Sequence, residues 1–443
     1  MARPKPLSGF PEFLPDERIV EQTVLDTLRE TFELHGFSNI ETRAVEPLAQ
    51  LSRKGEITKE VYVVRRLHAD GADQDELGLH FDLTVPLARW VLEHSGALQF
   101  PFRRYQIQKV WRGERPQEGR YREFTQADID IIGRGELAAH HDVEAPLVML
   151  EALERLHERI GLPPVLMHVN NRKLSEGFYR GLGVTDTLGV LQIVDKYDRI
   201  GAQATTQLLV DELGLDAGVA ERCVELATIR SDDTGFVDRV RTLGVADELL
   251  DEGLAELVTL VEEANRRVPG RLCADLSIAR GLDYYTGCVY ETELIGFESM
   301  GSISSGGRYD SLASDGRSSY PGVGISLGVT RLLGPLLARG QFVVSRPVPT
   351  CVLVAVDSEE TRERALDVAA VLRGRGIPTE VAPRADKYGK QIRYADRRGI
   401  PFVWFGPRVG EVKDIRSGDQ QPADAADWMP EEADLHPRVL PSE

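Results

Sequence analysis

An alternating stretch between residues 122 and 132 constrains the fold more than any other feature of the chain. On one side of this strand pattern the side chains are mildly apolar: Glu123, Thr125, Ala127, Ile129 and Ile131. On the other side they are charged groups, an amide and an aromatic ring: Arg122, Phe124, Gln126, Asp128 and Asp130. Residues 105–112 form a second strand pattern, and a loop rich in charge and turn formers separates the two. The pattern predicts a β-hairpin with one polar face.

Four arginines crowd this hairpin: Arg112, Arg115, Arg120 and Arg122. Clustered guanidinium groups repel one another unless an anion lies among them, and their planar fork suits phosphate and carboxylate groups. The spacing therefore allows two interpretations, a site for a polyanion or a solvated surface hairpin, and does not decide between them.

Composition restricts the class of protein. The chain has 443 residues and a formal net charge of −18, and its length suggests roughly two to four domains. So acidic a chain repels phosphate as a whole, and any nucleic-acid contact must use local basic patches. The cysteines are far apart and form no CxxC pair, which is typical of free thiols in a reducing compartment. We find no apolar run of membrane-spanning length and no secretory signal, and expect a cytoplasmic protein.

Asp82 and Thr84 lie two residues apart in the segment 77–88. On a strand the two side chains share a face and could hold an ammonium group between them. Both residue types are also common turn formers, and the spacing alone favours that simpler interpretation.

The adjacent histidines His140 and His141 fall on a helix expected over residues 140–157. Neighbouring side chains on a helix point about 100° apart, so we expect these two to be solvated or capping residues that do not share a metal.

The C-terminal part of the chain reads as a separate unit. After a segment with two prolines, 341–349, strand and helix patterns alternate from residue 351 to 405. The helix expected over 386–398 carries lysines and arginines with tyrosines among them, a combination that can bind unstacked bases or simply be solvated. Residues 420–443 are acidic and contain prolines, and we expect no regular structure there.

Several motifs resemble those of class II aminoacyl-tRNA synthetases, and most closely the histidyl-tRNA synthetase family. The stretch from Trp111 to Gln126, WRGERPQEGRYREFTQ, is similar to the second class II motif. The helix and strand expected over 15–44 resemble the first motif, and Arg331, in the first turn of a helix, resembles the arginine of the third. The strings RGLDYY at 280–285 and SGGRYD at 305–310 match two histidine-specific motifs of the family. The glycines of the second string alone would suggest only a hairpin turn.

The resemblance spans about residues 8–415 and implies an α+β fold: an antiparallel sheet flanked by helices, a helical insertion domain and a C-terminal α/β anticodon-binding domain. It divides the chain into a first part of the catalytic domain at 1–168, the insertion domain at 169–268 and a second part of the catalytic domain at 269–340. A linker at 341–349 and the anticodon-binding domain with its acidic tail at 350–443 follow.

The implied activity is ATP-dependent ligation of L-histidine to tRNA(His) by a homodimer, through a histidyl-adenylate, with release of AMP and pyrophosphate. Mg²⁺ is expected with the ATP, no metal is expected on the protein itself, and no membrane partner is expected. Catalytic roles fall to Arg112 and Arg280. The implied ATP-binding residues are Arg112, Glu114, Arg120, Phe124 and Arg331. The implied histidine-binding residues are Asp82, Thr84, Gln126, Asp130, Arg280, Tyr284, Tyr285 and Tyr309.

Two positions depart from the common pattern of the family. His80 stands where an arginine is usual, and Asp82 stands where bacterial members commonly have glutamate. An alternative function is that of a synthetase-like regulatory subunit of ATP phosphoribosyltransferase, which binds histidine without ligating it. Such proteins lack the C-terminal domain and tend to lose the phosphate-binding arginines, whereas this chain keeps both. A basic α/β scaffold without catalysis is a third alternative, which the arginine–tyrosine motifs disfavour.

Overall fold

The computed structural model describes residues 5–52, 60–67, 76–279, 284–314 and 316–441. The structure divides into two compact units. The first holds residues 1–11, 25–158 and 162–335, and the second holds residues 12–24, 159–161 and 336–443. Within the described ranges, we find no helix whose length and apolar character would let it cross a bilayer.

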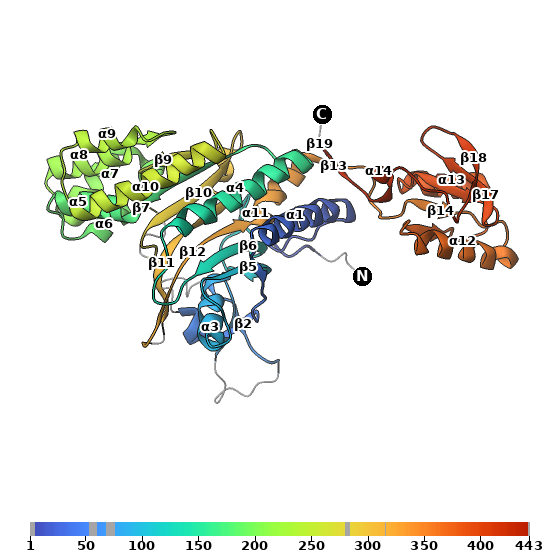
Figure 1. The fold of residues 1–443 in the computed structure, drawn as a ribbon, viewed down its shortest axis with the longest axis horizontal. Coiled ribbons are helices and arrows are strands. Elements are labelled where there is room, and N and C mark those ends of the chain that lie inside the picture. Colours follow the sequence, from blue (N-terminus) through green and yellow to red (C-terminus); the bar gives the residue numbers. More distant parts are fainter. Residues whose placement is uncertain (1–4, 53–59, 68–75, 280–283, 315, 442–443) are drawn as a thin grey trace. The chain divides into compact units, whose positions relative to one another are not determined.

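The first unit is built on a sheet that has nine strands in the described residues, in the order β1-β5-β6-β12-β11-β10-β7-β9-β8 (Figure 1). Their bounds are β1 Ser38–Asn39, β5 Phe102–Trp111, β6 Glu123–Ile132, β7 Val165–Asn171, β8 Arg230–Ser231, β9 Leu272–Asp275, β10 Cys288–Leu294, β11 Ser304–Ser314 and β12 Ser319–Gly328. The pairs β1–β5 and β7–β9 are parallel, and the other neighbours are antiparallel. The predicted antiparallel sheet is thereby confirmed.

The predicted hairpin is the pair β5–β6, which runs from Phe102 opposite Ile132 to Trp111 opposite Glu123. Its apolar face is buried as expected, because Ala127, Ile129 and Ile131 have no exposed surface. Most of the opposite face is buried as well, because Gln126, Asp128 and Asp130 are each at most 8% exposed. The interpretation of a solvated surface hairpin is therefore wrong, and the polar side chains need partners inside the molecule.

Helices line one face of this sheet (Figure 1). They are the second half of α1 (Pro15–Leu34), α4 (His140–Ile160) and α11 (Val329–Ala338). In α1 the buried side chains recur every four residues, at Val20, Val24, Leu28 and Phe32, as one face of a helix requires. The Phe32 ring lies 5.9 Å from that of Tyr105 on β5, which fixes the second half of α1 against the hairpin.

A second small sheet and a short helix precede the hairpin. The sheet has the order β2-β4-β3, with β2 Val45–Pro47, β3 Val63–Val64 and β4 Leu77–Leu79. The helices here are α2 (Leu48–Leu51) and α3 (Thr84–His94). Within 77–88 the strand β4 ends at Leu79, so Asp82 and Thr84 do not share a strand face, and the strand expected over 37–44 is reduced to β1. Asp82 accepts a hydrogen bond from the backbone N of Val85 at 3.0 Å, which is how an aspartate starts a helix.

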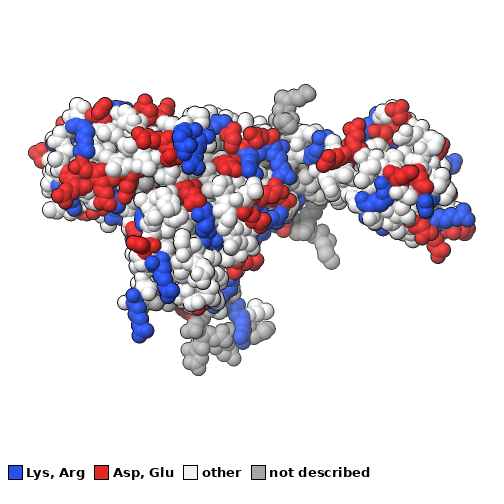
Figure 2. Space-filling model, viewed as in Figure 1, with Lys and Arg blue, Asp and Glu red and all other residues white. Residues whose placement is uncertain are grey.

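Residues 172–267 are mostly helical, as predicted. Between β7 and β9 the chain forms α5 (Arg172–Gly181), α6 (Thr187–Val194), α7 (Tyr197–Leu213), α8 (Ala217–Ala227), α9 (Phe236–Thr242) and α10 (Glu248–Arg267). Acidic and basic side chains are interspersed on the face shown in Figure 2. The helices α5 and α10 meet at two glycines, where backbone touches backbone. A Cβ on Gly177 would lie 2.2 Å from the N of Leu250, and one on Gly253 would lie 2.2 Å from the N of Leu174.

The second unit contains a sheet with the order β15-β14-β16-β17-β18 among its described residues. The strands are β14 Val352–Val354, β15 Thr379–Val381, β16 Phe402–Phe405, β17 Val409–Asp414 and β18 Gln420–Asp424. The helices are α12 (Arg362–Gly374), α13 (Tyr388–Arg397) and α14 (Glu432–Leu435). A separate pair joins β13 (Phe342–Val344) to β19 (Val439–Pro441). The expectation of an unstructured tail is wrong, because β18, α14 and β19 lie within it, and β13 lies in the segment expected to be a linker.

Prediction for the crossing of α5 and α10: Gly253→Ala lowers the stability of the protein by about 1–3 kcal/mol, because the added methyl group must push the two backbones apart. The measurement is thermal unfolding by calorimetry. The same change at Gly389 of α13, around which the structure leaves open space, is the control and leaves the transition nearly unchanged. Equal effects at both positions would contradict the close packing of α5 on α10.

Candidate active site

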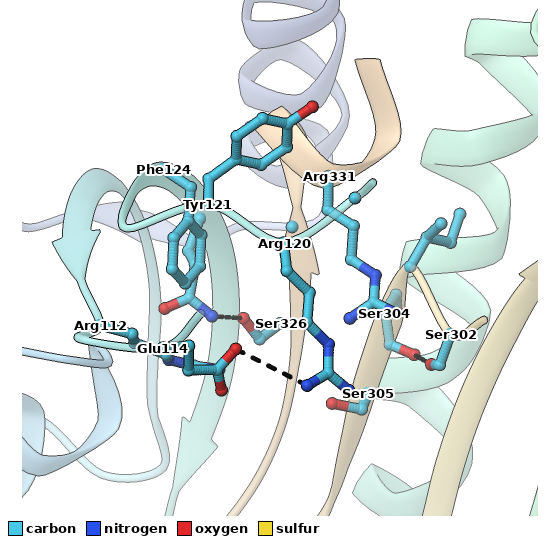
Figure 3. Close-up of a pocket in the computed structure, with 14 residues that line it drawn as sticks. Arg112, Glu114, Arg120, Tyr121, Phe124, Ser302, Ser304, Ser305, Ser326 and Arg331 are labelled. Carbon is cyan, nitrogen blue, oxygen red and sulfur yellow. Dashed lines mark hydrogen bonds and ion pairs between the residues drawn. The ribbon is translucent and has the colours of Figure 1, made fainter. Parts of the chain in front are cut away.

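A cavity opens where β6, β11, β12 and α11 meet, and it contains all five residues expected to bind ATP (Figure 3). Arg112 follows β5, Glu114 and Arg120 come from the loop of the hairpin, Phe124 lies on β6 and Arg331 lies on α11. Of the described residues, those lining the cavity include neither Arg115 nor Arg122. The hairpin arginines thus divide into a pair inside the cavity and a pair outside it.

Side-chain contacts hold the cationic groups of this cavity in place. Nε of Arg112 donates to the carbonyl of Phe81 at 3.0 Å, and its guanidinium lies 5.1 Å from the centre of the Phe124 ring. The guanidinium of Arg331 donates to the carbonyl of Met300 at 2.7 Å. Arg120 is half exposed and lies 3.8 Å from Glu114. Three guanidinium groups outnumber the nearby carboxylates, Glu114 in the lining and Glu60 beside it, and leave the cavity positively charged, as a polyanion requires.

A second cavity adjoins the first, and the two share Ser305 and Ser326. Its lining includes five of the residues expected to bind histidine: Thr84, Asp130, Tyr284, Tyr285 and Tyr309. Gln126 lines the first cavity. Asp82 is not among the described lining residues, but it is buried. Burial is the main cause that raises the pKa values of Tyr284 and Tyr285, and the charge of Asp82 adds to the rise, so Asp82 lies close to both rings. The expected contact Arg280 lies outside the described residues.

The acidic wall of the second cavity depends on a buried arginine that the sequence did not single out. Arg104 on β5 is completely buried and opposes Asp130 in the sheet. Its guanidinium lies 2.7 Å from Asp130 and 4.0 Å from Asp128. The hydroxyl of Tyr309 donates to the other oxygen of Asp130 at 2.6 Å. These contacts hold the Asp130 carboxylate ready to accept from a ligand N–H.

Glycines make room for the tyrosine rings of this cavity. A Cβ on Gly307 would lie 2.7 Å from the Tyr285 ring, and one on Gly322 would lie 2.4 Å from the Tyr309 ring. Gly307 lies within β11 and Gly322 within β12, so the glycines of the 305–310 string do not form the hairpin turn that they alone would have suggested. Burial raises the pKa values of Tyr285 and Tyr309, which keeps their hydroxyl groups neutral and able to donate or accept.

Comparison with known proteins identifies the family to which this chain belongs. The family model described as histidyl-tRNA synthetase matches residues 9–332. The chain belongs to the histidyl-tRNA synthetase family. A second model, described as an anticodon binding domain, matches residues 350–408. The predicted family, enzyme class and fold class are thereby confirmed.

Relatives and solved structures agree with this membership. The chain is 66% identical over 451 residues to the histidine–tRNA ligase of Cutibacterium acnes and 59% identical over 457 residues to that of Micrococcus luteus, with 99% of each chain covered in both cases. The crystal structure of histidyl-tRNA synthetase from Nostoc sp. shares 34% identity and a TM-score of 0.84, and covers 96% of this chain and 97% of that one. A Bacillus halodurans protein described as an ATP phosphoribosyltransferase regulatory subunit/histidyl-tRNA synthetase has 21% identity and a TM-score of 0.73, with 89% of this chain and 97% of that one covered, and shows the fold alone.

His80, which departs from the usual family residue, is part of the framework of this synthetase. It is completely buried, its Nε2 lies 2.7 Å from the carbonyl oxygen of Lys109, and its ring stacks on Trp111 with 5.6 Å between centres. Burial lowers its pKa, so the ring stays neutral and its Nε2–H donates to that carbonyl. His80 thus fastens the segment before α3 to β5.

The prediction that His140 and His141 point apart is wrong. Their rings lie 4.0 Å apart, and with Glu144 they place three possible ligand atoms within 4.8 Å of one another. Helix direction is a poor guide here because the side-chain torsions decide where the rings lie, and Glu144 holds the buried His141 ring through its Nδ1 at 2.9 Å. Glu144 is already paired with the guanidinium of Arg103 and with Nδ1 of His141.

Prediction for the acidic wall: Asp128→Asn raises the melting temperature of the protein more at pH 8 than at pH 5. Burial raises the pKa of Asp128 to about 7, Arg104 lowers it in part, and Asp130 adds to the rise. Between about pH 4 and pH 7 the folded chain therefore keeps a proton that the unfolded chain releases, so ionised Asp128 costs stability as the pH rises toward 7. Calorimetry of both proteins at pH 5, 6, 7 and 8 measures the difference.

The neutral asparagine stabilises the protein only at pH values where the buried Asp128 of the wild type would be ionised. A difference in melting temperature that is constant across the pH series, or larger at pH 5, would contradict the buried, hard-to-ionise state of Asp128.

Proposed function

We propose that the two adjoining cavities are the site at which this histidine–tRNA ligase joins L-histidine to ATP, the first cavity holding the nucleotide and the second the amino acid. The observation that supports this most directly is their shared wall. Ser305 and Ser326 border both cavities, so ligands in the two would touch there. The arginine-lined and carboxylate-lined cavities also match the opposite charges of a triphosphate and an amino group.

In the first step, the carboxylate of histidine attacks the α-phosphate of ATP and pyrophosphate leaves. Two anions must meet, so the main tasks of the protein are to position and to neutralise them. Arg112 would contact the α-phosphate and the carboxylate, and Arg120 and Arg331 would contact the outer phosphates. Glu114 would accept from the adenine amino group while Phe124 stacks on the ring. Arg280, expected beside Arg112, keeps this role as a prediction.

Mg²⁺ fits this site as part of the substrate. Among the described residues that line the first cavity, Glu114 supplies a carboxylate, whereas a preformed Mg²⁺ cage needs more oxygen ligands. An ion that arrives on the ATP phosphates requires no such cage, and it adds positive charge where the pyrophosphate leaves. We therefore infer that the enzyme uses MgATP.

The histidine contacts follow from the second cavity. Asp82, Thr84 and Gln126 would hold the α-ammonium group, Asp130, Tyr285 and Tyr309 would contact the imidazole, and Tyr284 completes the aromatic wall. The ring of Tyr284 stacks on that of Tyr309 with 5.6 Å between centres. Because analogues without ring nitrogens would leave these buried polar groups unpaired, the cavity can select histidine by hydrogen bonding.

The basic face of α13 would bind the tRNA. Of the basic residues expected there, Lys390, Arg393 and Arg397 line a surface groove together with Arg384. Asp386 and Asp396 lie in the same lining, and Lys390 is paired with Asp386 at 3.3 Å, so the groove keeps a smaller excess of positive charge. Arg398 is paired with Glu380 at 2.9 Å, which leaves it less able to bind phosphate. The match to an anticodon binding domain at residues 350–408 contains this helix. A local basic groove also explains how a chain of net charge −18 can bind a polyanion.

The remaining expectations belong to the same proposal. The chain would act in the cytoplasm as a homodimer, with the segment 169–268 as a helical insertion domain between two parts of the catalytic domain, 1–168 and 269–340. In support, α5 to α10 lie between β7 and β9 of one sheet, so the chain leaves the sheet and returns to it.

Prediction for the nucleotide cavity: Arg120→Ala raises KM for ATP in histidine-dependent ATP–pyrophosphate exchange by about tenfold or more, because a charged contact to phosphate is lost. Arg115→Ala, in the same loop but outside the cavity, is the matched control and leaves that KM nearly unchanged. Exchange supported by an amino acid other than histidine, or equal effects of the two changes, would contradict the assignment.

Prediction for the tRNA contact: the double change Arg384→Ala and Arg393→Ala lowers kcat/KM for tRNA charging by about tenfold and flattens its salt dependence, since fewer phosphates are neutralised. Pyrophosphate exchange, which needs no tRNA, stays unchanged. Arg364→Ala on the exposed surface of α12 is the control. Parallel loss of exchange and charging would show instead that the groove supports the structure of the whole enzyme.

A further inference from the structure

Asp128 is a buried carboxylate for which the proposed substrate contacts provide no role. It lies on β6 between Gln126 and Asp130, is 3% exposed and lines the second cavity. The pairing of β6 with β12 places it opposite Ser326. Burying a carboxylate costs free energy, so its position here calls for a physical reason.

A chain of hydrogen bonds joins Asp128 to Gln126. The hydroxyl of Ser326 donates to Oδ1 of Asp128, and Nε2 of Gln126 donates to that hydroxyl oxygen at 2.8 Å. The second of these bonds is the dashed line that ends on Ser326 in Figure 3. Asp128 and Gln126 are therefore linked by two hydrogen bonds through one serine on the neighbouring strand.

The donor in each of these two hydrogen bonds follows from the protons that each group carries. An ionised carboxylate only accepts, so the single proton of the Ser326 hydroxyl must go to Asp128. The Ser326 oxygen can then only accept from Gln126, which turns the NH₂ group of that amide toward the serine. The amide oxygen must face the other way. Among the described residues, this Oε1 atom is buried and meets no hydrogen-bond donor, although Gln126 as a whole is only 8% exposed.

We propose that Asp128 is a positioning residue that acts through Ser326 to hold the Gln126 oxygen toward the wall shared by the two cavities, where it accepts a hydrogen bond from the α-ammonium group of histidine. An amide without such a neighbour can present either end, and its NH₂ end would repel an ammonium group. The inference rests on the proposed function of the site and adds a residue that decides how the site recognises the amino group.

The charges around Asp128 set the conditions of the test. Arg104 faces it from β5, Asp130 from β6, Asp82 from the start of α3, and Tyr285 from the segment before β10. Burial raises the pKa of Asp128 to about 7, so the carboxylate is mostly ionised at pH 8. Binding is therefore measured at pH 8.

Asp128→Asn keeps the size of the side chain but no longer determines which groups donate in the hydrogen bonds from residue 128 through Ser326 to Gln126. The asparagine NH₂ group can donate to Ser326, whose hydroxyl can then donate to the Gln126 oxygen and stabilise the flipped amide. The ammonium group would meet NH₂ in place of the carbonyl oxygen. Ser326→Ala breaks the same chain at its centre and serves as a second variant if Asp128→Asn does not fold.

The experiment is isothermal titration of the full chain with L-histidine and with imidazolepropionate, which lacks the amino group. The Kd of imidazolepropionate divided by the Kd of L-histidine measures how strongly the ammonium group is recognised. Asp128→Asn should reduce this ratio by about tenfold or more, the effect of one hydrogen bond to a charged group, while the Kd of imidazolepropionate changes by less than about threefold. Ser326→Ala should reduce the ratio similarly, and the double variant should add little further loss.

A rescue separates orientation from a general loss of packing. Adding Gln126→Glu to Asp128→Asn gives a side chain whose two oxygens both accept, and restores the net charge of the site. The ratio should return to within about threefold of the wild-type value. No rescue, or an equal loss of affinity for both compounds in Asp128→Asn, would overturn the role of Asp128. A wild-type chain that does not prefer histidine would overturn the proposed function itself.

Discussion

The register of β5 against β6 is the constraint on which the rest of the catalytic structure depends. Side chains alternate along a strand, so a shift by one residue would turn Phe124, Gln126 and Asp130 out of the cavities and bring isoleucines in. The pairing of Arg104 with Asp130 across the two strands reinforces this register, because neither charge could be buried without the other. One strand pairing thus determines both the stability of the sheet centre and the chemistry on its face.

The buried charges of the site are stabilised by contacts with one another and with neutral hydrogen-bond donors. Arg104 balances the carboxylates of the second cavity, and the neutral hydroxyl of Tyr309 donates to Asp130. Burial raises the pKa of Asp128 to about 7, and Arg104 lowers it only in part. Its cost in stability is the kind that active sites accept in return for preorganised groups. Glycines at 307 and 322 complete the arrangement, because any side chain there would displace a tyrosine ring.

Separation of charge lets an acidic protein handle two polyanions. Three arginines line the proposed nucleotide cavity, and the proposed tRNA groove at α13 of the second unit has four basic and two acidic residues in its described lining. With a net charge of −18, the rest of the surface repels phosphate, so both sites act only at short range. This distribution favours binding at defined positions over non-specific attachment along a nucleic acid.

Local chemistry in the sequence determined much of this protein: the alternating hairpin, the amphipathic face of α1, and the motifs that marked Arg112, Asp130 and Arg331 as a group. Tertiary structure decided what depends on partners distant in the chain. Asp82 accepts from Val85 in the first turn of a helix, and the hydroxyl that donates to Asp128 belongs to Ser326, 198 residues away. Propensity and spacing are properties of neighbours along the chain, whereas register, burial and hydrogen-bond direction exist only once distant strands have paired.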